Sequence, residues 1–243
     1  MLMLAGKTVV MTGGGGGLGR CYGVAMARAG AAVVVTDIDL AAAQASADAI
    51  TATGGRAIAV QGDVTKAATF EKLFDRAEQE YGSLDVLLNI AGMFPRRALV
   101  DMEEEEWDAV ITLNLKSVYL GARAAIRRML PRNSGVVLST ASGTGIRGQP
   151  KGSAYSASKA GIIGFTRAVS LELKDTGVRI NCFGPGATDT PLWRVNKTEE
   201  DVKRLIAAGY VYQPDDFSNV VVFLASDLSA PLNGEFISRD LHR

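Results

Sequence analysis

Residues 8–19 read Thr8-Val9-Val10-Met11-Thr12-Gly13-Gly14-Gly15-Gly16-Gly17-Leu18-Gly19, a short apolar run followed at once by a glycine-rich turn. A helical pattern begins directly after the turn and extends from Leu18 to Ala29. Glycines there let the backbone approach a pyrophosphate, and the helix start offers free N–H groups and a partial positive charge. Strand, turn and helix in this order indicate a phosphate site, although five consecutive glycines are also compatible with a plain flexible turn.

The same alternation of short apolar runs and helical segments continues along the chain. Further strands are predicted at residues 33–35, 57–60, 86–88, 136–138 and 178–180, with a weaker last one at 235–237, and helices near 40–53, 66–80, 103–130, 155–174 and 215–226. Strands that are apolar on both faces and joined by helices predict a parallel sheet covered on each side. The expected fold class is therefore α/β, with a single doubly wound Rossmann-type domain over residues 1–243 and about seven strands.

Residues 186–212 depart from this alternation. They carry little strand pattern and several turn residues, so we expect an inserted loop with a short helix, a common form for a substrate lid. No linker, charge block or internal repeat marks a second domain, and the run Glu103–Glu106 is expected to be the solvated start of a helix.

The composition narrows the classes of partner. The chain has 26 basic and 26 acidic side chains, so a formal net charge of zero gives no global field to attract nucleic acid or an anionic membrane. No stretch reaches the roughly 18 apolar residues of a membrane span, and the opening residues 1–7 show no leader pattern. We therefore expect a cytoplasmic protein whose partner is a small molecule.

Cysteine and histidine usage argues against several chemistries. Cys21 and Cys182 lie far apart without CxxC spacing, which favours buried reduced thiols over a disulfide or a metal site. The one histidine, His242, stands next to the last residue, where chain ends tend to fray. A Ser-His-Asp hydrolase needs a firmly held imidazole, and a zinc enzyme usually uses several His or Cys ligands. Neither class is expected, and no metal is predicted.

A carboxylate follows the second predicted strand. Asp37 stands about 18 residues past the last glycine, close to the spacing of a ribose-binding acid. It would accept hydrogen bonds from the adenosine ribose and repel a 2′-phosphate, and no Lys or Arg in the glycine turn offsets that charge. NAD is therefore favoured over NADP as the cofactor. The alternative is that Asp37 merely caps the helix beginning near Leu40, for which Asp39 is the better candidate.

Tyr155 and Lys159 stand four residues apart in a predicted helix, which places both side chains on one face. A free tyrosine has a pKa near 10, and a fixed cation nearby favours the phenolate. Lowering that pKa by about 3 units requires roughly 4 kcal/mol, which Lys159 and a cationic nicotinamide ring would share in a water-poor cleft. Such a pair is often simply exposed on a helix surface without a function. The other motifs in the chain must therefore show whether this pair belongs to an active site.

Six motifs occur together and in order along nearly the whole chain. They are Thr12-Gly13-x-x-x-Gly17-x-Gly19, Asn89-x-Ala91-Gly92, Asn114, Ser142, Tyr155-x-x-x-Lys159, and Asn181 followed by Pro185-Gly186. With this joint pattern the sequence resembles the short, single-domain type of short-chain dehydrogenase/reductase. The resemblance implies an oxidoreductase that moves a hydride between a secondary alcohol or ketone and the nicotinamide of NAD. It also implies a homotetramer, since members of that family are typically tetramers.

The resemblance implies catalytic roles for four residues. Tyr155 would exchange a proton with the substrate oxygen, and Lys159 would lower its pKa while bonding the nicotinamide ribose. Ser142 would hold the substrate oxygen, with Ser139 as the fallback candidate. Asn114 would hold a water that links Lys159 to solvent, the alternative being a polar residue that bonds helix backbone.

The same resemblance implies a cofactor site along the carboxyl ends of the strands. The glycine turn would hold the pyrophosphate, Asp63 and Val64 would flank the adenine, and the Asn89–Gly92 turn would line the adenosine side, with Ile90 where a second asparagine is often seen. Residues after the sixth strand would contact the nicotinamide. The expected cofactor residues are Gly13, Gly16, Gly17, Leu18, Gly19, Asp37, Ile38, Asp63, Val64, Asn89, Ala91, Gly92, Tyr155, Lys159, Pro185, Gly186, Thr188 and Thr190.

Substrate identity depends on the segments around residues 93–97, 144–151 and 191–212. Phe94, Gln149 and Trp193 are candidates for shaping the pocket, and each is equally compatible with ordinary packing. Several loop cations would recognise a carboxylate or phosphate if they face the pocket, and are otherwise simply solvated. These are Arg96, Arg97, Arg147, Lys151, Arg194 and Lys197.

Two alternatives to a general alcohol dehydrogenase stay open. A reductase of β-ketoacyl groups on an acyl carrier shares every motif quoted, but such enzymes usually use NADPH, which Asp37 disfavours. An NAD-sensing binding module would keep the cofactor site, but it has no need of Ser142, Tyr155 and Lys159 together. The C-terminal residues 236–243 also depart from the Val-Asp-Gly-Gly-like ending common in the family, so the last strand is expected while the packing of the tail stays open.

Overall fold

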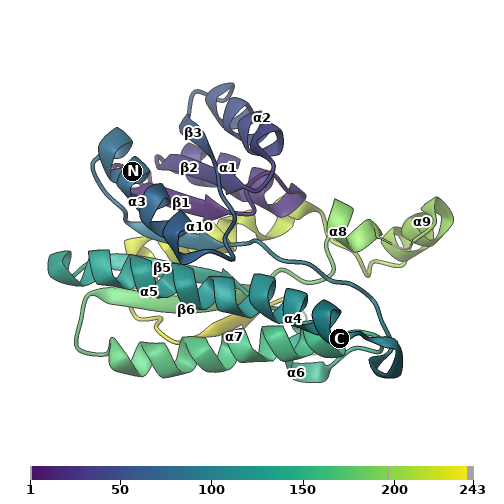
Figure 1. The fold of residues 1–243 in the computed structure, drawn as a ribbon. Coiled ribbons are helices and arrows are strands. Elements are labelled where there is room, and N and C mark those ends of the chain that lie inside the picture. The colour runs from purple at the N-terminus through teal and green to yellow at the C-terminus, as the bar shows by residue number, and fades with distance from the viewer. Residues whose placement is uncertain (1, 196, 240–243) are drawn as a thin grey trace.

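Seven strands pair in one parallel sheet in the computed structural model, which describes residues 2–195 and 197–239 (Figure 1). The strands are β1 (Thr8–Thr12), β2 (Ala32–Asp37), β3 (Arg56–Gln61), β4 (Val86–Asn89), β5 (Gly135–Thr140), β6 (Val178–Gly184) and β7 (Phe236–Ser238). Their order across the sheet is β3-β2-β1-β4-β5-β6-β7, and every neighbouring pair is parallel. The predicted doubly wound α/β fold is confirmed, including the weak last strand.

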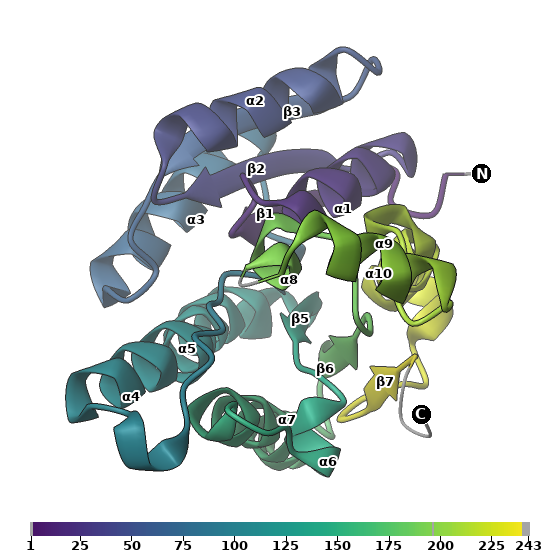
Figure 2. The ribbon, with the colours of Figure 1, turned by 90° about the vertical axis from the view of Figure 1, so that its right-hand side faces the viewer.

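Helices cover both faces of this sheet. The longer ones are α1 (Gly17–Arg28), α2 (Leu40–Thr51), α3 (Ala67–Tyr81), α4 (Glu104–Ile111), α5 (Ser117–Met129), α7 (Ser153–Glu172), α9 (Glu199–Ala207) and α10 (Ser218–Ala225). One apolar core joins the sheet to α1, α2 and α10, and a second joins it to α3 and α5 (Figures 1 and 2). Strands β1, β4, β5 and β6 are buried along their whole length, because helices cover them on both sides.

The strand order reverses between β1 and β4, which lie side by side although β2 and β3 come between them in sequence. In open α/β sheets this reversal leaves a crevice at the carboxyl ends of the strands, where ligands bind. The Thr12 hydroxyl oxygen at the end of β1 accepts a hydrogen bond from the Ile90 N–H at 3.2 Å. The two loops that flank the crevice are therefore tied together.

The predicted helix at 103–130 is interrupted. A π-helical turn, Thr112–Lys116, separates α4 from α5, and Asn114 lies within it. A π turn inserts an extra residue into the helix, which the apolar periodicity does not reveal. The acidic run was predicted correctly as a helix start, since Glu103 and Glu106 form a capping box at the beginning of α4.

The segment 186–212 contains two helices rather than the single short helix that the sequence predicted. These are α8 (Pro191–Arg194) and α9, both of which lie nearer the viewer than the sheet in Figure 2. Thr188 and Tyr212 form an isolated parallel bridge, so the two ends of the segment lie next to each other. Other short helices that the sequence did not predict are α6 (Thr144–Arg147) and the 3₁₀ turns Leu99–Asp101 and Asp227–Ser229. Two more 3₁₀ turns, Leu130–Arg132 and Pro214–Phe217, lie at ends of the predicted helices 103–130 and 215–226.

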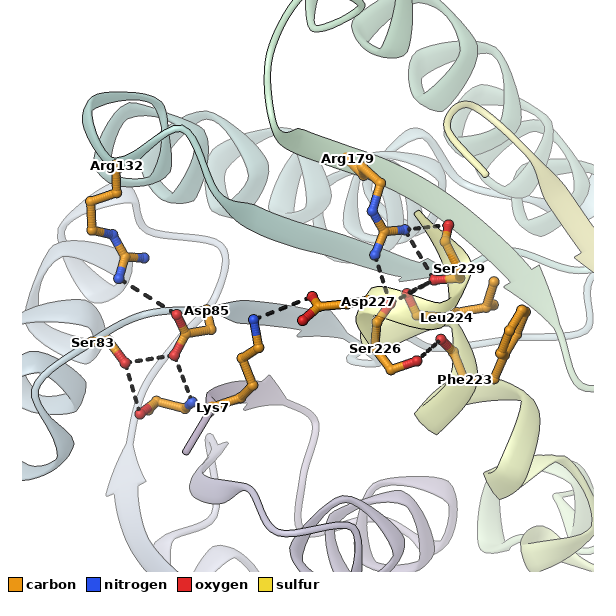
Figure 3. Close-up of polar contacts among 11 residues, drawn as sticks. Lys7, Ser83, Asp85, Arg132, Arg179, Phe223, Leu224, Ser226, Asp227 and Ser229 are labelled. Carbon is orange, nitrogen blue, oxygen red and sulfur yellow. Dashed lines mark hydrogen bonds and ion pairs between the residues drawn. The ribbon is translucent and has the colours of Figure 1, made fainter. Parts of the chain in front are cut away.

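The amino ends of the strands are joined by polar side chains (Figure 3). Before β4, Asp85 accepts a hydrogen bond from the Thr8 N–H at 2.8 Å, which fixes β4 beside β1. The buried guanidinium of Arg179 in β6 donates to the carbonyl oxygens of Ser226 at 2.9 Å and Ser229 at 3.1 Å. These contacts stabilise the edge of the sheet opposite the crevice.

Both cysteines are free, and only one of them is buried. Cys182 is buried as predicted, but Cys21 is half-buried, because it lies on a partly covered face of α1. Burial raises the pKa of each thiol, that of Cys182 to about 11, so the reactive thiolate is disfavoured. His242 lies outside the described residues. Within the described ranges, no helix is long and apolar enough to cross a membrane, and no group of His, Cys, Asp or Glu side chains is arranged to hold a metal ion.

Candidate active site

The glycine turn has the shape of a pyrophosphate cradle. Gly13 has a positive φ of 63°, and a Cβ added there would lie 2.7 Å from the Ala91 backbone. At Gly19 an added Cβ would lie 2.5 Å from the Gly13 carbonyl oxygen, so helix α1 packs directly against the turn. No side chain caps the start of α1, where Gly16 is the N-cap residue. The first N–H groups of the helix therefore suit an anion such as the cofactor pyrophosphate.

Asp37 lies against this turn at the end of β2. Its carboxylate accepts hydrogen bonds from the Gly15 N–H at 3.1 Å and the Asp39 N–H at 3.2 Å. Asp39 caps α2 by accepting from the N–H groups of Ala41 and Ala42 at 2.9 and 3.2 Å, so the preference for Asp39 as the cap is confirmed. No cation in the described part of the chain forms an ion pair with Asp37.

A cavity of about 340 Å³ opens just past the end of β2, where the adenine is expected. Ile38 and Asp63 line it, whereas Val64 is buried and does not. The Asp63 carboxylate accepts hydrogen bonds from the Thr65 hydroxyl at 2.6 Å and N–H at 2.9 Å, which hold the pKa of Asp63 below its usual value. Asp63 is therefore ionised and fixed in orientation.

The turn after β4 contributes unevenly to the crevice. Gly92 lines a second, larger cavity, which we call the main cavity, and Ala91 packs against Gly13. Asn89 is buried and lines neither cavity. The Asn89 amide donates to the Ser139 hydroxyl at 3.2 Å, also in the interior. Ser139, the fallback for the substrate-binding serine, is thus paired away from the cavity.

The main cavity, of about 440 Å³, is bounded by the loops after β1, β4, β5 and β6. Ser142, Tyr155 and Lys159 line it together with all four predicted nicotinamide contacts. The lining residues that the sequence had predicted are Leu18, Gly92, Ser142, Tyr155, Lys159, Pro185, Gly186, Thr188 and Thr190. The three candidates for shaping the substrate pocket, Phe94, Gln149 and Trp193, line the same cavity.

Tyr155 is held from two sides. Its ring stacks on Phe94 with centroids 4.2 Å apart and planes 19° from parallel. Burial raises the pKa of Tyr155 to about 12, and a hydrogen bond with Ser142 partly offsets that effect. The Ser142 oxygen also accepts from the Thr144 hydroxyl at 3.0 Å and N–H at 3.2 Å, so its position is fixed.

Lys159 is buried one turn further along α7. Its Nζ donates to the Thr140 carbonyl oxygen at 2.6 Å and lies 5.5 Å from the centre of the Tyr155 ring. Burial lowers the pKa of Lys159 to about 8. Desolvation of the phenol is the largest effect on the pKa of Tyr155, and the lowering of that pKa by Lys159 together with a bound nicotinamide stays a prediction. Burial therefore favours the neutral form of both Tyr155 and Lys159.

We predict that Lys159→Met stabilises the protein at pH 7 by on the order of 2 kcal/mol while abolishing turnover. The folded-state pKa of about 8 lies below the usual 10.5, so the cost of burying the ammonium is complete below pH 8. It declines as pH rises from 8 toward 10.5, and the difference between the two proteins should shrink accordingly. Denaturant unfolding at pH 7 and pH 10 measures this, with the exposed Lys174→Met as the control. A less stable Lys159→Met protein at pH 7 would contradict the prediction.

Asn114 connects the turn after β4 to helix α7. Its side-chain oxygen accepts from the Met93 N–H at 2.8 Å, and its amide donates to the Met93 carbonyl at 2.9 Å and the Ser158 hydroxyl at 3.1 Å. Ser158 in turn donates to the Tyr155 carbonyl at 2.7 Å. The Asn114 side chain thus bonds the backbone of another segment, and its role in a proton relay stays a prediction.

The segment after β6 closes the nicotinamide side. Gly186 has a positive φ of 82°, and the buried Thr188 donates its hydroxyl to the Gly186 carbonyl at 3.2 Å. Thr190 caps α8 by accepting from the Trp193 N–H at 3.2 Å. A Cβ on Gly17 would lie 3.3 Å from the Thr190 methyl group, so this segment contacts the glycine turn.

Three contributors to the site were missed by sequence reasoning. Thr140 accepts from Lys159, Thr144 donates to Ser142, and Ser158 joins Asn114 to α7. Thr140 and Ser158 stand next to predicted residues in the chain, but a hydroxyl residue in a strand or helix carries no signal of which partner it bonds. Their roles depend on the tertiary placement of β5 and α7.

Comparisons with known proteins agree with this geometry. The chain matches a family model described as short chain dehydrogenase over residues 7–201. It is 34% identical over 241 residues to a 3-oxoacyl-(acyl-carrier-protein) reductase of Chlamydia trachomatis, covering 98% of this chain and 97% of the relative. It is 36% identical over 197 residues to a cis-4-hydroxycyclohexanecarboxylate dehydrogenase of Sinomonas cyclohexanicum, covering 79% and 78% of the two chains. A solved short-chain type dehydrogenase/reductase from Mycobacterium marinum superposes with a TM-score of 0.89 at 30% identity, covering 99% and 96%. The two relatives are named for different substrates, so likeness alone leaves the substrate open.

Proposed function

The chain belongs to the short-chain dehydrogenase/reductase family of oxidoreductases, and from this premise we propose that it oxidises a secondary alcohol with NAD as the cofactor. Tyr155 acts as the acid/base, Ser142 holds the substrate oxygen, and Lys159 assists Tyr155. The observation that carries the proposal is that these three side chains line one cavity together with the predicted nicotinamide contacts. A pure NAD sensor has no use for that arrangement.

The protein's own groups prepare the proton transfer. Ser142 receives two hydrogen bonds from Thr144, which leaves its hydroxyl proton to be donated to the substrate oxygen or to Tyr155. The stacked Phe94 ring excludes water from one face of Tyr155, so the phenol faces the cavity in a fixed orientation. When bound, the nicotinamide supplies the hydride acceptor and a positive charge. Tyr155 takes the hydroxyl proton of the alcohol, and the ammonium of Lys159 stabilises the phenolate.

Cofactor preference is proposed from Asp37. Its carboxylate is fixed against the glycine turn by backbone N–H groups, and no described cation neutralises it. A ribose offers hydroxyl donors to such a group, whereas a 2′-phosphate meets a like charge. Both the preference for NAD and the direction of reaction proposed here, oxidation, are consistent with a cellular NAD pool that is mostly oxidised.

One alternative within the family has a specific observation in its favour. The Chlamydia relative is named as a 3-oxoacyl-(acyl-carrier-protein) reductase and matches nearly the full chain. A reductase of this kind would consume a 3-oxoacyl thioester with NADPH. An assay with acetoacetyl-coenzyme A and either reduced cofactor separates the two, because our proposal expects little turnover with NADPH.

Opposite pH dependences are expected for the two reaction directions. Oxidation needs Tyr155 without its proton, and burial raises the pKa of this phenol to about 12. The kcat/KM for alcohol oxidation should therefore rise with pH from 6 to 9, by at most about tenfold per unit, while that for ketone reduction falls. Profiles in both directions test this. An oxidation optimum more acidic than the reduction optimum would exclude Tyr155 as the group that titrates.

We further propose that the chain acts as a cytoplasmic single-domain enzyme, that residues 186–212 serve as a substrate lid, and that the protein assembles as a homotetramer. Support for the lid comes from Thr188, Thr190 and Trp193, which place this segment on the cavity wall. The tetramer rests on the family resemblance alone, and sedimentation velocity measures it directly.

A further inference from the structure

We propose that the substrate carries an anionic group, a carboxylate or a phosphate, which Arg96 and Arg147 bind at the mouth of the main cavity. The inference rests on the proposed function, since it assigns a substrate class to the same site. Its evidence is the charge of the residues that line the cavity, the way Arg96 is held, and the pairing of the other two loop arginines, Arg97 and Arg194.

The cavity walls are strongly biased in charge. Among the described residues that line it, three are cationic, namely Arg96, Arg147 and Lys159, and none is acidic. The whole chain has equal numbers of basic and acidic residues, so composition does not explain the bias. Lys159 is buried beside Tyr155 and is accounted for by the proposed chemistry. Arg96 and Arg147 are exposed at the mouth and have no part in that chemistry.

Arg96 is aligned with the reacting group by a stack of rings. Its guanidinium carbon lies 4.9 Å from the centre of the Phe94 ring, which itself stacks on Tyr155 at 4.2 Å. A guanidinium over an aromatic ring is attracted to it and loses freedom, while its N–H groups stay available for an oxyanion. The stack therefore places the Arg96 guanidinium near the Tyr155 phenol, to which the substrate hydroxyl group would bind.

Arg147 approaches the cavity from a different element. It ends α6, which lies beside α7 in both ribbon views, away from α1 and the glycine turn (Figures 1 and 2). The loops that carry the two arginines are joined, because the Arg97 N–H donates to the Lys151 carbonyl oxygen at 3.0 Å. The cofactor pyrophosphate is expected at the glycine turn, so the anion that these arginines bind belongs to the substrate.

Two other loop arginines are already paired with carboxylates. Arg97 pairs with Glu106 at 2.9 Å, and Arg194 pairs with Asp189 at 2.6 Å and with Glu199. No described acidic side chain forms an ion pair with Arg96 or Arg147. The sequence could not distinguish the two arginines that form ion pairs from the two that do not, whereas the structure distinguishes them.

Lys197 adds a further positive charge near Arg96, although it does not itself line the cavity. It lies over the ring of Trp193, a cavity residue, with its Nζ 4.3 Å from the ring centre. Burial, and next the charge of Arg96, lower the pKa of Lys197, while Asp201 opposes them. Like charges gathered at one cavity mouth repel each other, and a bound anion would relieve that repulsion.

A binding experiment tests the inference without requiring turnover. The protein saturated with NADH is titrated with two matched probe pairs, cyclohexanecarboxylate against its carboxamide and cyclohexyl phosphate against cyclohexanol, and Kd is read from NADH fluorescence. We expect at least one anion to bind about tenfold more tightly than its neutral partner. The pair that discriminates identifies the carboxylate or the phosphate as the group preferred.

Matched variants locate the effect. Arg96→Gln and Arg147→Gln should each weaken binding of the preferred anion about tenfold and leave its neutral partner unchanged. Arg97→Gln removes the same charge from the next residue, but its guanidinium pairs with Glu106, so its anion affinity should match wild type. Equal binding of anion and neutral partner in both pairs by the wild-type protein would overturn the inference. An equal loss in all three variants would do the same, because it would indicate a diffuse surface charge.

Turnover distinguishes the failure of this inference from that of the proposed function. With NAD, 4-hydroxycyclohexanecarboxylate should give a kcat/KM about tenfold above that of its methyl ester. Turnover of both at equal rates, with equal binding of anion and neutral partner in both probe pairs, would refute the anionic site and leave the dehydrogenase proposal intact. Tighter binding of the anion than of its neutral partner, with no turnover of any alcohol or ketone, would refute the dehydrogenase proposal and leave the anionic site intact.

Discussion

Tyr155→Phe is expected to lower kcat by about 10³-fold, within the range that a positioned proton donor contributes. The substitution removes only the phenol oxygen. The ring that stacks on Phe94 at 4.2 Å is retained, so packing of the cavity wall and the fold should be unchanged. NADH affinity should stay within a few-fold of wild type, because the glycine turn and Asp37 are untouched.

The measurement is steady-state turnover together with NADH titration and thermal unfolding of each protein. Tyr119→Phe is the matched control, since Tyr119 lies 44% exposed on α5 and lines no described cavity. The control should be indistinguishable from wild type. If Tyr155→Phe retained a tenth or more of the wild-type turnover, another group would have to be the acid/base.

Asp37→Ala is expected to shift the ratio of kcat/KM for NAD over NADP by about 100-fold toward NADP. A fixed carboxylate facing a 2′-phosphate costs several kcal/mol, and each 1.4 kcal/mol is a factor of ten. NAD affinity should also fall, because the ribose loses an acceptor and the Gly15 N–H, bonded to Asp37 at 3.1 Å, loses its partner.

Asp39→Asn provides the control for charge alone. Asp39 stands two residues further along and caps α2, a role that asparagine also fills. The variant loses one negative charge near the cofactor site but keeps the cap, so its cofactor ratio should remain that of wild type. A similar shift in both variants would show that overall charge, and not the position of Asp37, sets the preference.

The fold was predictable because its signals are local. Runs such as Val33–Val35 are apolar on both faces, which is typical of a strand covered on both sides of a parallel sheet. Tyr155 and Lys159 were placed on one helix face by their spacing, and Asp39 was preferred over Asp37 as the cap by its position before α2. Each of these inferences uses residues within a few positions of each other.

The rest of the site depends on contacts between distant segments. The stack of Phe94 on Tyr155 joins the loop after β4 to α7, and no periodicity indicates it. The rise in the Tyr155 pKa has the same origin, since desolvation depends on what covers the phenol. The π turn around Asn114 could not be predicted either, because the helical pattern continues across it.

The measurement that tests the central claim most directly is absorbance at the NADH band. Purified protein with NAD or NADP is supplied with secondary alcohols, including sugars, hydroxy acids, steroids and cyclic diols, and with ketones and either reduced cofactor in the reverse direction. We predict a signal that is selective for NAD and absent from Tyr155→Phe. Turnover with NADP alone, or silence in both directions while NADH still binds, would contradict the proposed function.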